Sequence, residues 1–479
     1  MLFSSLTFLG FFGIVAVLHY SAPARWRWAF LLLVSLYFYS TFRAEYVLLL
    51  CYAAAVAYGA GWKLARWRGT HAGRVLLVGA VVAELAALGI FKYFNFVAGS
   101  LEALSRPLAD IALPRLGLVL PVGLSFFTFS CVSYLIDVHR GRIEAERHPG
   151  RLAVYVAFFP KLLAGPIERA GPFLAQLAAP ARFDADRVAA GAQLMLWGLF
   201  KKVVIADRLA VFADAGFAAP AFASPVALVL AVYCYAFQIY CDFSGYSDIA
   251  IGAARVLGFD LMENFRRPYL ARSVHEFWSR RWHISLMAWF RDYLYIPLGG
   301  SRVSLPRRHL NVLAVFLVSG LWHGANWTFV VWGGLNGLYQ IIHAALGGAR
   351  GRLARRLRLP AWLTAAASVL LTFHLIAFAW IFFRAASLKD AVTVITRIHA
   401  ALPRLGVLAR NYNWTGEFGL AVVLVAFLIS VEVLDERIGV RAVLARWPVA
   451  VRWGAYYGLM AALLVLGVWG LNRFVYMQF

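Results

Sequence analysis

Residues 311–337 read NVLAVFLVSGLWHGANWTFVVWGGLNG, and this stretch decides the fold class. Apolar runs continue on both sides of His323, and a helix that crosses a bilayer needs about 20 predominantly apolar residues. An ionisable side chain within such a run is costly and usually functional. We therefore interpret His323 as the reactive centre and the rest of the chain as a membrane-embedded structure around it.

The composition of the whole chain supports this interpretation. Of the 479 residues, 62% are hydrophobic and 14% are charged, whereas soluble proteins average about 45–50% apolar and about 25% charged residues. The net charge of +23 does not indicate nucleic-acid binding, because the Lys and Arg residues cluster between apolar runs. Charge in these positions orients membrane helices and favours contact with anionic lipid headgroups.

The apolar runs predict an all-α, polytopic integral membrane protein. Allowing for merged or half-buried pieces, we expect about 11–13 membrane elements in one continuous domain over residues 1–479. The predicted spans are 2–20, 28–42, 46–61, 74–98, 117–138, 188–206, 222–241, 309–323, 326–346, 362–383, 418–434 and 452–472.

Two segments are too polar, or too rich in proline and glycine, for ordinary spanning helices. Residues 158–173, FFPKLLAGPIERAGPF, contain three prolines and cannot form one straight helix. Irregular backbone at membrane depth is tolerated only against protein or a wet cavity, so this segment lines a funnel, re-enters, or is a plain surface loop. Residues 239–258 carry Asp242 and Asp248 around Gly245 and are expected to be similarly irregular. The two carboxylates form a metal or acid–base site, pair with nearby arginines, or cap the following helix.

Residues 264–298 alternate bulky aromatic side chains with cations. Such a segment suits a membrane interface. Its arginines also suit a phosphate-bearing donor, because a guanidinium presents a forked set of hydrogen-bond donors to phosphate. We therefore select Arg280, Arg281 and Arg291 as candidate donor-binding residues, and interfacial packing is a compatible interpretation.

Two Trp–His pairs, Trp282–His283 and Trp322–His323, mark the central part of the sequence. A histidine on an apolar helix is more often a satisfied core residue, but the glycine, asparagine and tryptophan residues close to His323 favour a function. Burial disfavours imidazolium, so a neutral His323 is available as a general base that takes a proton from a hydroxyl attacking a thioester. We expect His283 to orient it, to polarise the carbonyl or to bind the acyl donor. Asn326 is expected to position the thioester carbonyl.

Tryptophans around His323 complete the expected site. Trp322, Trp327 and Trp332 are expected to form an aromatic wall, in which Trp322 contacts substrate. Gly324 is expected to allow backbone or substrate to approach closely, because it has no side chain. The four cysteines show neither metal nor disulfide spacing, so we expect no metal site.

Several blocks together resemble the membrane-bound O-acyltransferase family and, within it, the bacterial alginate O-acetyltransferase branch of the AlgI type. The blocks occur in the family's order and run from about residue 116 to 384. They are PVGLSFFTFSCVSYLIDVHRG, FFPKLLAGPIERAGPF, QIYCDFSGYSDIAIGAARVLGF, WHISLMAWFRDYLYIPLGGSR, LWHGANWTFVVWGGLNG and AWIFFRA. The helices outside this core are similar only in hydropathy.

The resemblance implies a helical membrane domain with a central funnel or tunnel that meets at a catalytic histidine, here His323, with His283 at the partner position. It implies acetyl transfer from a cytoplasmic thioester, either acetyl-CoA or an acyl carrier protein, with no bound cofactor. The implied acceptor is an extracytoplasmic polysaccharide, either alginate-like or part of the cell wall. A periplasmic SGNH-type transferase often completes the transfer in this branch, and the implied location is the bacterial inner membrane.

The chain ends in LNRFVYMQF, which is similar to endings of this branch. The hydroxyl of Tyr476 is a candidate acyl acceptor in a relay, whereas anchoring by an aromatic belt is the simpler interpretation. One other function class stays open, a transporter or flippase of a lipid-linked sugar with the broken segments as its pathway. The lack of an apparent inverted repeat and the Trp–His pairs argue against transport.

Overall fold

The computed structural model describes residues 1–107, 112–180, 182–356, 359–470 and 474–475. Within these ranges the chain forms helices and connections and no β-strand, which confirms the predicted all-α class. The chain separates into two compact units. Unit 1 comprises Met1–Met195 with Ser247–Glu263, and unit 2 comprises Leu196–Tyr246 with Asn264–Phe479.

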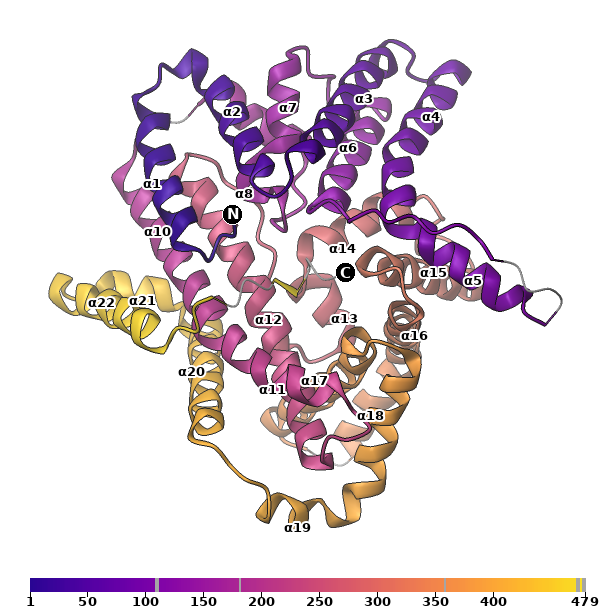
Figure 1. Ribbon diagram of the computed structural model, residues 1–479, viewed down its shortest axis with the longest axis vertical. Coiled ribbons are helices and arrows are strands. Elements are labelled where there is room, and N and C mark those ends of the chain that lie inside the picture. Colours follow the sequence, from indigo (N-terminus) through magenta and orange to yellow (C-terminus); the bar gives the residue numbers. More distant parts are fainter. Residues whose placement is uncertain (108–111, 181, 357–358, 471–473, 476–479) are drawn as a thin grey trace. The chain divides into compact units, whose positions relative to one another are not determined.

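Unit 1 is a helical bundle in which α3, α4, α6 and α7 pack together (Figure 1). Its helices are α1 (Leu6–Ser21), α2 (Arg27–Ser40), α3 (Val47–Arg66), α4 (His71–Leu88), α5 (Phe94–Ser105), α6 (Leu124–His139), α7 (Pro149–Ala157), α8 (Phe159–Leu162), α9 (Ala170–Ala178) and most of α10 (Ala185–Leu199).

The prediction that residues 158–173 cannot form one helix is confirmed. The four-residue helix α8 is followed by an irregular stretch and then by the start of α9. Lys161 and Glu168 within it are only 4% and 5% exposed, so the interpretation as a plain surface loop is wrong. The Lys161 ammonium lies 4.3 Å from the ring centroid of Tyr155, and Glu168 accepts a 2.8 Å hydrogen bond from the backbone N–H of Met262.

Unit 2 contains both Trp–His pairs. Its helical elements are a π-helical turn at Phe200–Ala206, α11 (Asp207–Ala218), α12 (Pro225–Val256, ending in unit 1), α13 (Val274–Glu276), a π-helical turn at Phe277–Arg281, α14 (Ile284–Phe290), a π-helical turn at Arg291–Tyr295, α15 (Leu305–His323), α16 (Trp327–Arg356), α17 (Ala361–Arg384), α18 (Leu388–Ala401), α19 (Leu405–Arg410), α20 (Gly416–Ile438), α21 (Val440–Arg446) and α22 (Val449–Leu466).

Helices α15 and α16 lie side by side and hold His323 at their junction (Figure 1). Glycines allow this close contact: a Cβ at Gly320 would lie 2.2 Å from the carbonyl oxygen of Phe329, and one at Gly333 would lie 2.3 Å from that of Phe316. Small residues at helix interfaces are typical of membrane proteins, because they let backbones approach closely.

The expected irregularity of residues 239–258 is wrong, because α12 runs without interruption to Val256. Gly245 lies among the polar residues that suggested an irregular segment, and it serves the packing of this helix. A Cβ at this position would lie 2.7 Å from the carbonyl oxygen of Gly198. The glycine in this polar stretch therefore marks a close contact between helices and not an interruption of α12.

Nine helices within the described residues are long and apolar enough to cross a membrane, and the protein is a multi-pass membrane protein. They are Ala44–Arg66, His71–Ser105, Ala185–Ala218, Pro225–Val256, Trp327–Gly347, Ala361–Arg384, Leu388–Arg410, Gly416–Ile438 and Val449–Leu466. The sequence predicted no span between residues 383 and 418, yet Leu388–Arg410 is one of the nine. Its charged residues obscured it in the apolar pattern.

Candidate active site

His323 is the last residue of α15 and is 2% exposed. Three aromatic rings surround its imidazole at T-shaped angles. The ring centroids of Trp322, Trp332 and Phe383 lie 4.9, 5.0 and 5.2 Å from that of His323. Edge-to-face contacts of this kind fix the orientation of a ring without adding charge to it.

The predicted aromatic wall is confirmed for two of its three tryptophans. Trp322 and Trp332 are 3% and 1% exposed, but Trp327 is 52% exposed and is not part of the enclosure. Phe383 and Trp380 of α17 take its place, and the Trp380 ring stacks on Trp332 at 5.7 Å. Both lie in the AWIFFRA block, so that block could have drawn attention to them.

His283 lies between the π-helical turn at Phe277–Arg281 and α14, and it is 1% exposed. Its backbone is left-handed, with φ 46° and ψ 52°. Besides His283, Arg267 is the other non-glycine residue with positive φ in the described part of the chain. Such a conformation costs about 1–3 kcal/mol and persists only where the surroundings enforce it, often at functional sites.

The structure brings the two histidines together. Their ring centroids lie 6.4 Å apart, and the Trp322 ring lies 5.7 Å from that of His283. The Phe243 ring of α12 closes the other side of His283 at 4.6 Å. The two imidazoles are therefore held close to each other and away from water.

Burial sets the charge of His283. It lowers the pKa of the imidazole from the ordinary 6.5 to about 3. A neutral imidazole has one N–H donor and one acceptor nitrogen. His283 can therefore donate to a carbonyl oxygen, or accept a proton, without first losing a charge.

Asn326 and Gly324 have structural contacts of their own. The side-chain oxygen of Asn326 accepts a 3.1 Å hydrogen bond from the N–H of Thr328, and its amide nitrogen donates to the carbonyl of Ala386 at 3.2 Å. A Cβ at Gly324 would lie 2.1 Å from the ring of Phe329. These contacts of Asn326 and Gly324 stabilise the connection between α15 and α16. The role of Asn326 in binding substrate stays a prediction.

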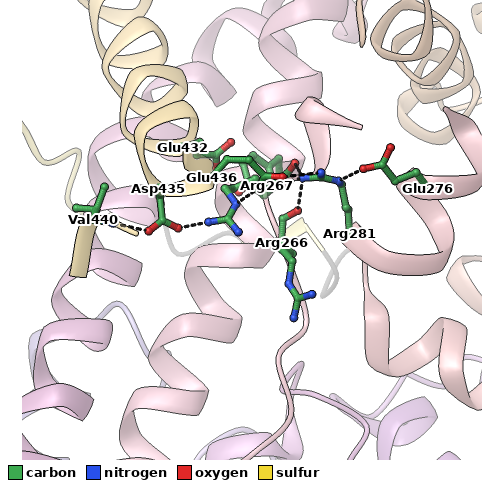
Figure 2. A network of polar contacts seen from close by, with 9 residues as sticks. Arg266, Arg267, Glu276, Arg281, Glu432, Asp435, Glu436 and Val440 are labelled. Atoms are coloured by element: carbon green, nitrogen blue, oxygen red, sulfur yellow. Dashed lines mark hydrogen bonds and ion pairs between the residues drawn. The ribbon is translucent and has the colours of Figure 1, made fainter. Parts of the chain in front are cut away.

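The three selected arginines have different surroundings. Arg280 is exposed. Arg281 donates to Glu276 at 2.6 Å and to Glu436 at 2.8 Å (Figure 2). These ion pairs indicate a structural role for Arg281, because its guanidinium already contacts two carboxylates.

Arg291 lies at a pocket of about 500 Å³. Ile284 and Trp278 line this pocket, and they connect it to the site: Ile284 follows His283 in sequence, and the Trp278 ring lies 5.4 Å from that of Trp332. Other cationic or titratable side chains that line it are His275, Arg308, His309 and His343. Most of the remaining lining is apolar, as is typical of pockets that bind small molecules.

Within the described part of the chain, the carboxylate of Asp242 pairs with a lysine and not with Arg280, Arg281 or Arg291, contrary to one interpretation of the sequence. It lies 2.6 Å from the ammonium of Lys202, which is also 2.8 Å from Asp207. All three side chains are at least 90% buried. Buried charges need paired partners of this kind. Lys202 was not predicted as part of this region from the sequence, where the Lys201–Lys202 pair interrupts an apolar run far from Asp242.

Asp242 also holds the C-terminal segment. Its second carboxylate oxygen accepts a 2.7 Å hydrogen bond from the backbone N–H of Val475. The Phe474 ring stacks on Tyr246 at 4.4 Å and lies 6.2 Å from Phe243, which contacts His283. Tyr476, the proposed relay residue, lies outside the described residues.

The fold and the site define a multi-pass membrane protein with a pair of buried histidines enclosed by aromatic side chains. The model of the membrane-bound O-acyltransferase family matches residues 80–386. This chain belongs to that family and is an O-acyltransferase.

Individual relatives agree with this assignment. The chain is 39% identical to the probable alginate O-acetylase AlgI of Azotobacter vinelandii over 87% of its own length and 79% of the relative's. It is 34% identical to the peptidoglycan O-acetyltransferase of Helicobacter pylori, over 81% and 76% of the two lengths. It is 25% identical to the teichoic acid D-alanyltransferase of Bacillus subtilis, over 64% and 76%.

Proposed function

We propose that this protein moves an acetyl group from a cytoplasmic thioester toward the hydroxyls of an extracytoplasmic polysaccharide. The observation that carries the proposal is the pair of buried imidazoles 6.4 Å apart, within a chain of the O-acyltransferase family. A site that holds two imidazoles away from water can remove a proton and stabilise a carbonyl in the same step.

His323 acts as the general base in this proposal. It takes the proton of the attacking hydroxyl as the oxygen–carbon bond forms at the thioester carbonyl. The carbon–sulfur bond then breaks, and the proton held by His323 passes to the leaving sulfur. His283 donates a hydrogen bond to the carbonyl oxygen as negative charge develops there. General-base catalysis supplies about 10²–10⁴-fold in rate, and one hydrogen-bond donor to a developing oxyanion supplies about 10²–10³-fold.

The donor occupies the pocket beside the site, with a phosphate near Arg291 and Arg308 and an extended arm along the apolar lining. Acetyl-CoA and an acetylated carrier protein both present such an arm and phosphate. The position of Arg291 at the pocket supports its predicted role, whereas the ion pairs of Arg281 do not. We retain Arg280 as an exposed phosphate contact and Trp322 and Asn326 as residues that position the acyl group.

The acceptor is a hydroxyl-rich polymer such as an alginate-like exopolysaccharide or a cell-wall glycan. The relatives that are more than 30% identical are named for acetyl transfer to alginate or peptidoglycan, which favours acetyl over other acyl groups. We further propose the bacterial inner membrane as the location and a periplasmic SGNH-type transferase as the partner that completes the transfer.

We also propose that the hydroxyl of Tyr476 accepts the acyl group as an intermediate carrier. The neighbouring residues support this proposal, because Phe474 and Val475 are bound next to the aromatic residues that contact His283. In such a relay the Tyr476 oxygen replaces the polymer hydroxyl as the first nucleophile, and a second transfer releases the tyrosine.

The transporter alternative has less support than it had from sequence. One of its two broken segments, residues 239–258, is mostly a continuous helix. Transport of a lipid-linked sugar by purified protein in liposomes, without turnover of a thioester, would establish that alternative and contradict the enzyme.

Replacement of His323 by Ala tests the proposed function. We expect acetylation of the cell's polysaccharide to fall at least about 100-fold, because the general base is removed, while the amount of protein in the membrane is unchanged. The measurement is ester-bound acetate on purified polymer. His374→Ala is the matched control on an apolar helix and should acetylate normally. Retained acetylation in His323→Ala would refute the assignment.

A further inference from the structure

Residues 264–267 lie alongside residues 281–285, the segment that contains His283. The N–H of Arg266 donates to the carbonyl of Arg281 at 2.8 Å, and the N–H of Ile284 donates to the carbonyl of Asn264 at 2.9 Å. These two hydrogen bonds flank His283, so the path of the backbone through the histidine depends on the position of residues 264–267.

The side chain of Arg281 strengthens this connection. Its guanidinium donates to the carbonyl oxygen of Arg267 at 3.2 Å and to that of Arg266 at 3.4 Å. Figure 2 shows that Arg266 takes part through its backbone, since its own guanidinium points away from the network. Arg281, two residues before His283, therefore connects its own segment to residues 266–267 through hydrogen bonds.

Helix α20 supplies the anions that hold both arginines. Glu436 lies 2.8 Å from Arg281 and 2.7 Å from Arg267, and Asp435 also pairs with Arg267 (Figure 2). Glu436 thus bridges two arginines that come from the two paired segments. One of these arginines, Arg267, has the left-handed backbone that His283 also has, with φ values of 43° and 46°.

We propose that Glu436 and Arg281 are positioning residues that hold His283 in its left-handed backbone conformation. A residue with a side chain does not adopt that conformation without support from its surroundings. When the bridge is intact, the imidazole of His283 is held against Phe243 and faces His323. When the bridge is lost, the backbone relaxes and the imidazole moves away from the reacting carbonyl.

This inference rests on the proposed function, because it assigns a consequence for acyl transfer. Arg281 and Arg291 should therefore differ in their effect on the kinetics. Arg281 acts on the geometry of the histidine, so its loss reduces kcat. Arg291 lies at the donor pocket, so its loss raises KM for the thioester.

The test measures initial rates of thioester turnover by the full-length protein in membrane vesicles. Acetyl-CoA is the probe, or acetylated carrier protein if only that thioester is used by the wild type. We expect Glu436→Gln to reduce kcat by about tenfold to a hundredfold, because small misplacements of catalytic groups have effects of this size. KM should stay within about twofold of the wild type, since the donor pocket is unchanged. Glu436→Asp, which keeps the charge, should recover most of kcat.

The matched control is Glu417→Gln, which removes an ion pair with Arg208 at the other end of the same helix. We expect this control to keep the wild-type kcat. An unchanged kcat in Glu436→Gln, or an equal loss in Glu417→Gln, would overturn the inference. A loss of kcat explained by a lower thermal unfolding midpoint would also overturn it. If His323→Ala stays active, the proposed function fails; if only Glu436→Gln stays active, the positioning role fails alone.

Discussion

The neutral state of the His283 imidazole follows from its burial, because transfer of a charged ring out of water is unfavourable. Its pKa falls from 6.5 to about 3 in the folded protein. Between these two values the unfolded chain binds a proton that the folded protein does not bind. The contribution of His283 to stability is therefore full above about pH 6.5 and is lost as the pH falls.

This linkage predicts the acid response of a variant. Below pH 6.5 the free energy of unfolding should fall by about 1.4 kcal/mol per pH unit because of His283 alone. The thermal unfolding midpoint of the wild type in detergent should therefore drop more between pH 7.5 and 5.0 than that of His283→Gln. Parallel decreases in the two proteins would contradict the neutral assignment.

The sequence identified His323 and His283 because a histidine in an apolar context is costly wherever it lies. It did not identify Phe383, Lys202 or Glu436 as parts of the site or its support. Their side chain types are ordinary for their segments, and only their contacts with distant residues give them a role. The same reason explains why Trp327 was wrongly included in the aromatic wall. Its residue type fitted the prediction, but its side chain is 52% exposed.

At the scale of elements, a hydrogen bond to a buried carboxylate helps to hold Phe474 and Val475 of the C-terminal segment in place. Val475→Pro removes the N–H that donates to Asp242, whereas Val475→Ala retains it. An unsatisfied buried partner costs about 1–3 kcal/mol, so polymer acetylation should fall about tenfold in Val475→Pro. It should change little in Val475→Ala, and equal activity of both variants would show that the hydrogen bond has no role.

The same segment allows a direct test of the relay. Mass spectrometry of the C-terminal peptide from active cells should detect an acetyl group on Tyr476, and Tyr476→Phe should abolish both this signal and polymer acetylation. Full polymer acetylation in Tyr476→Phe would remove the relay and leave His323 acting directly on the final acceptor.

Predictions of elements from sequence failed where a glycine or a charge had a partner on another helix. The polar residues around Gly245 indicated an irregular segment, but the helix continues there, Gly245 meets the backbone of Gly198 and Asp242 pairs with Lys202. The predicted break in residues 158–173 was correct, because proline prevents a helix whatever its neighbours are. The proline ring prevents a helix through its own covalent structure, which the sequence shows. The role of Gly245 depends on the helix that packs against it, which the sequence does not show.

At the scale of the whole molecule, clusters of Lys and Arg between the apolar runs contribute to the net charge of +23 and predict the side of the membrane on which they lie. The exposed connection that contains Ser301 and Arg302 should be cytoplasmic, because basic connections remain on that side. In right-side-out vesicles of a cysteine-free background, Ser301→Cys should react with an impermeant maleimide only after permeabilisation. Labelling before permeabilisation would reverse the predicted orientation.

Sequence by itself determined that this is a helical, multi-pass membrane protein with a costly histidine in its interior. Hydropathy, proline and charge clusters act through local composition, so they can be read without coordinates. The tertiary structure decided that His283 lies close to His323, that Phe383 of α17 packs on His323 and that Glu436 pairs with Arg281 and Arg267. These contacts join residues 40 to 155 positions apart (His283 to His323 and Arg281 to Glu436), and their formation depends on how helices pack, which no local pattern specifies.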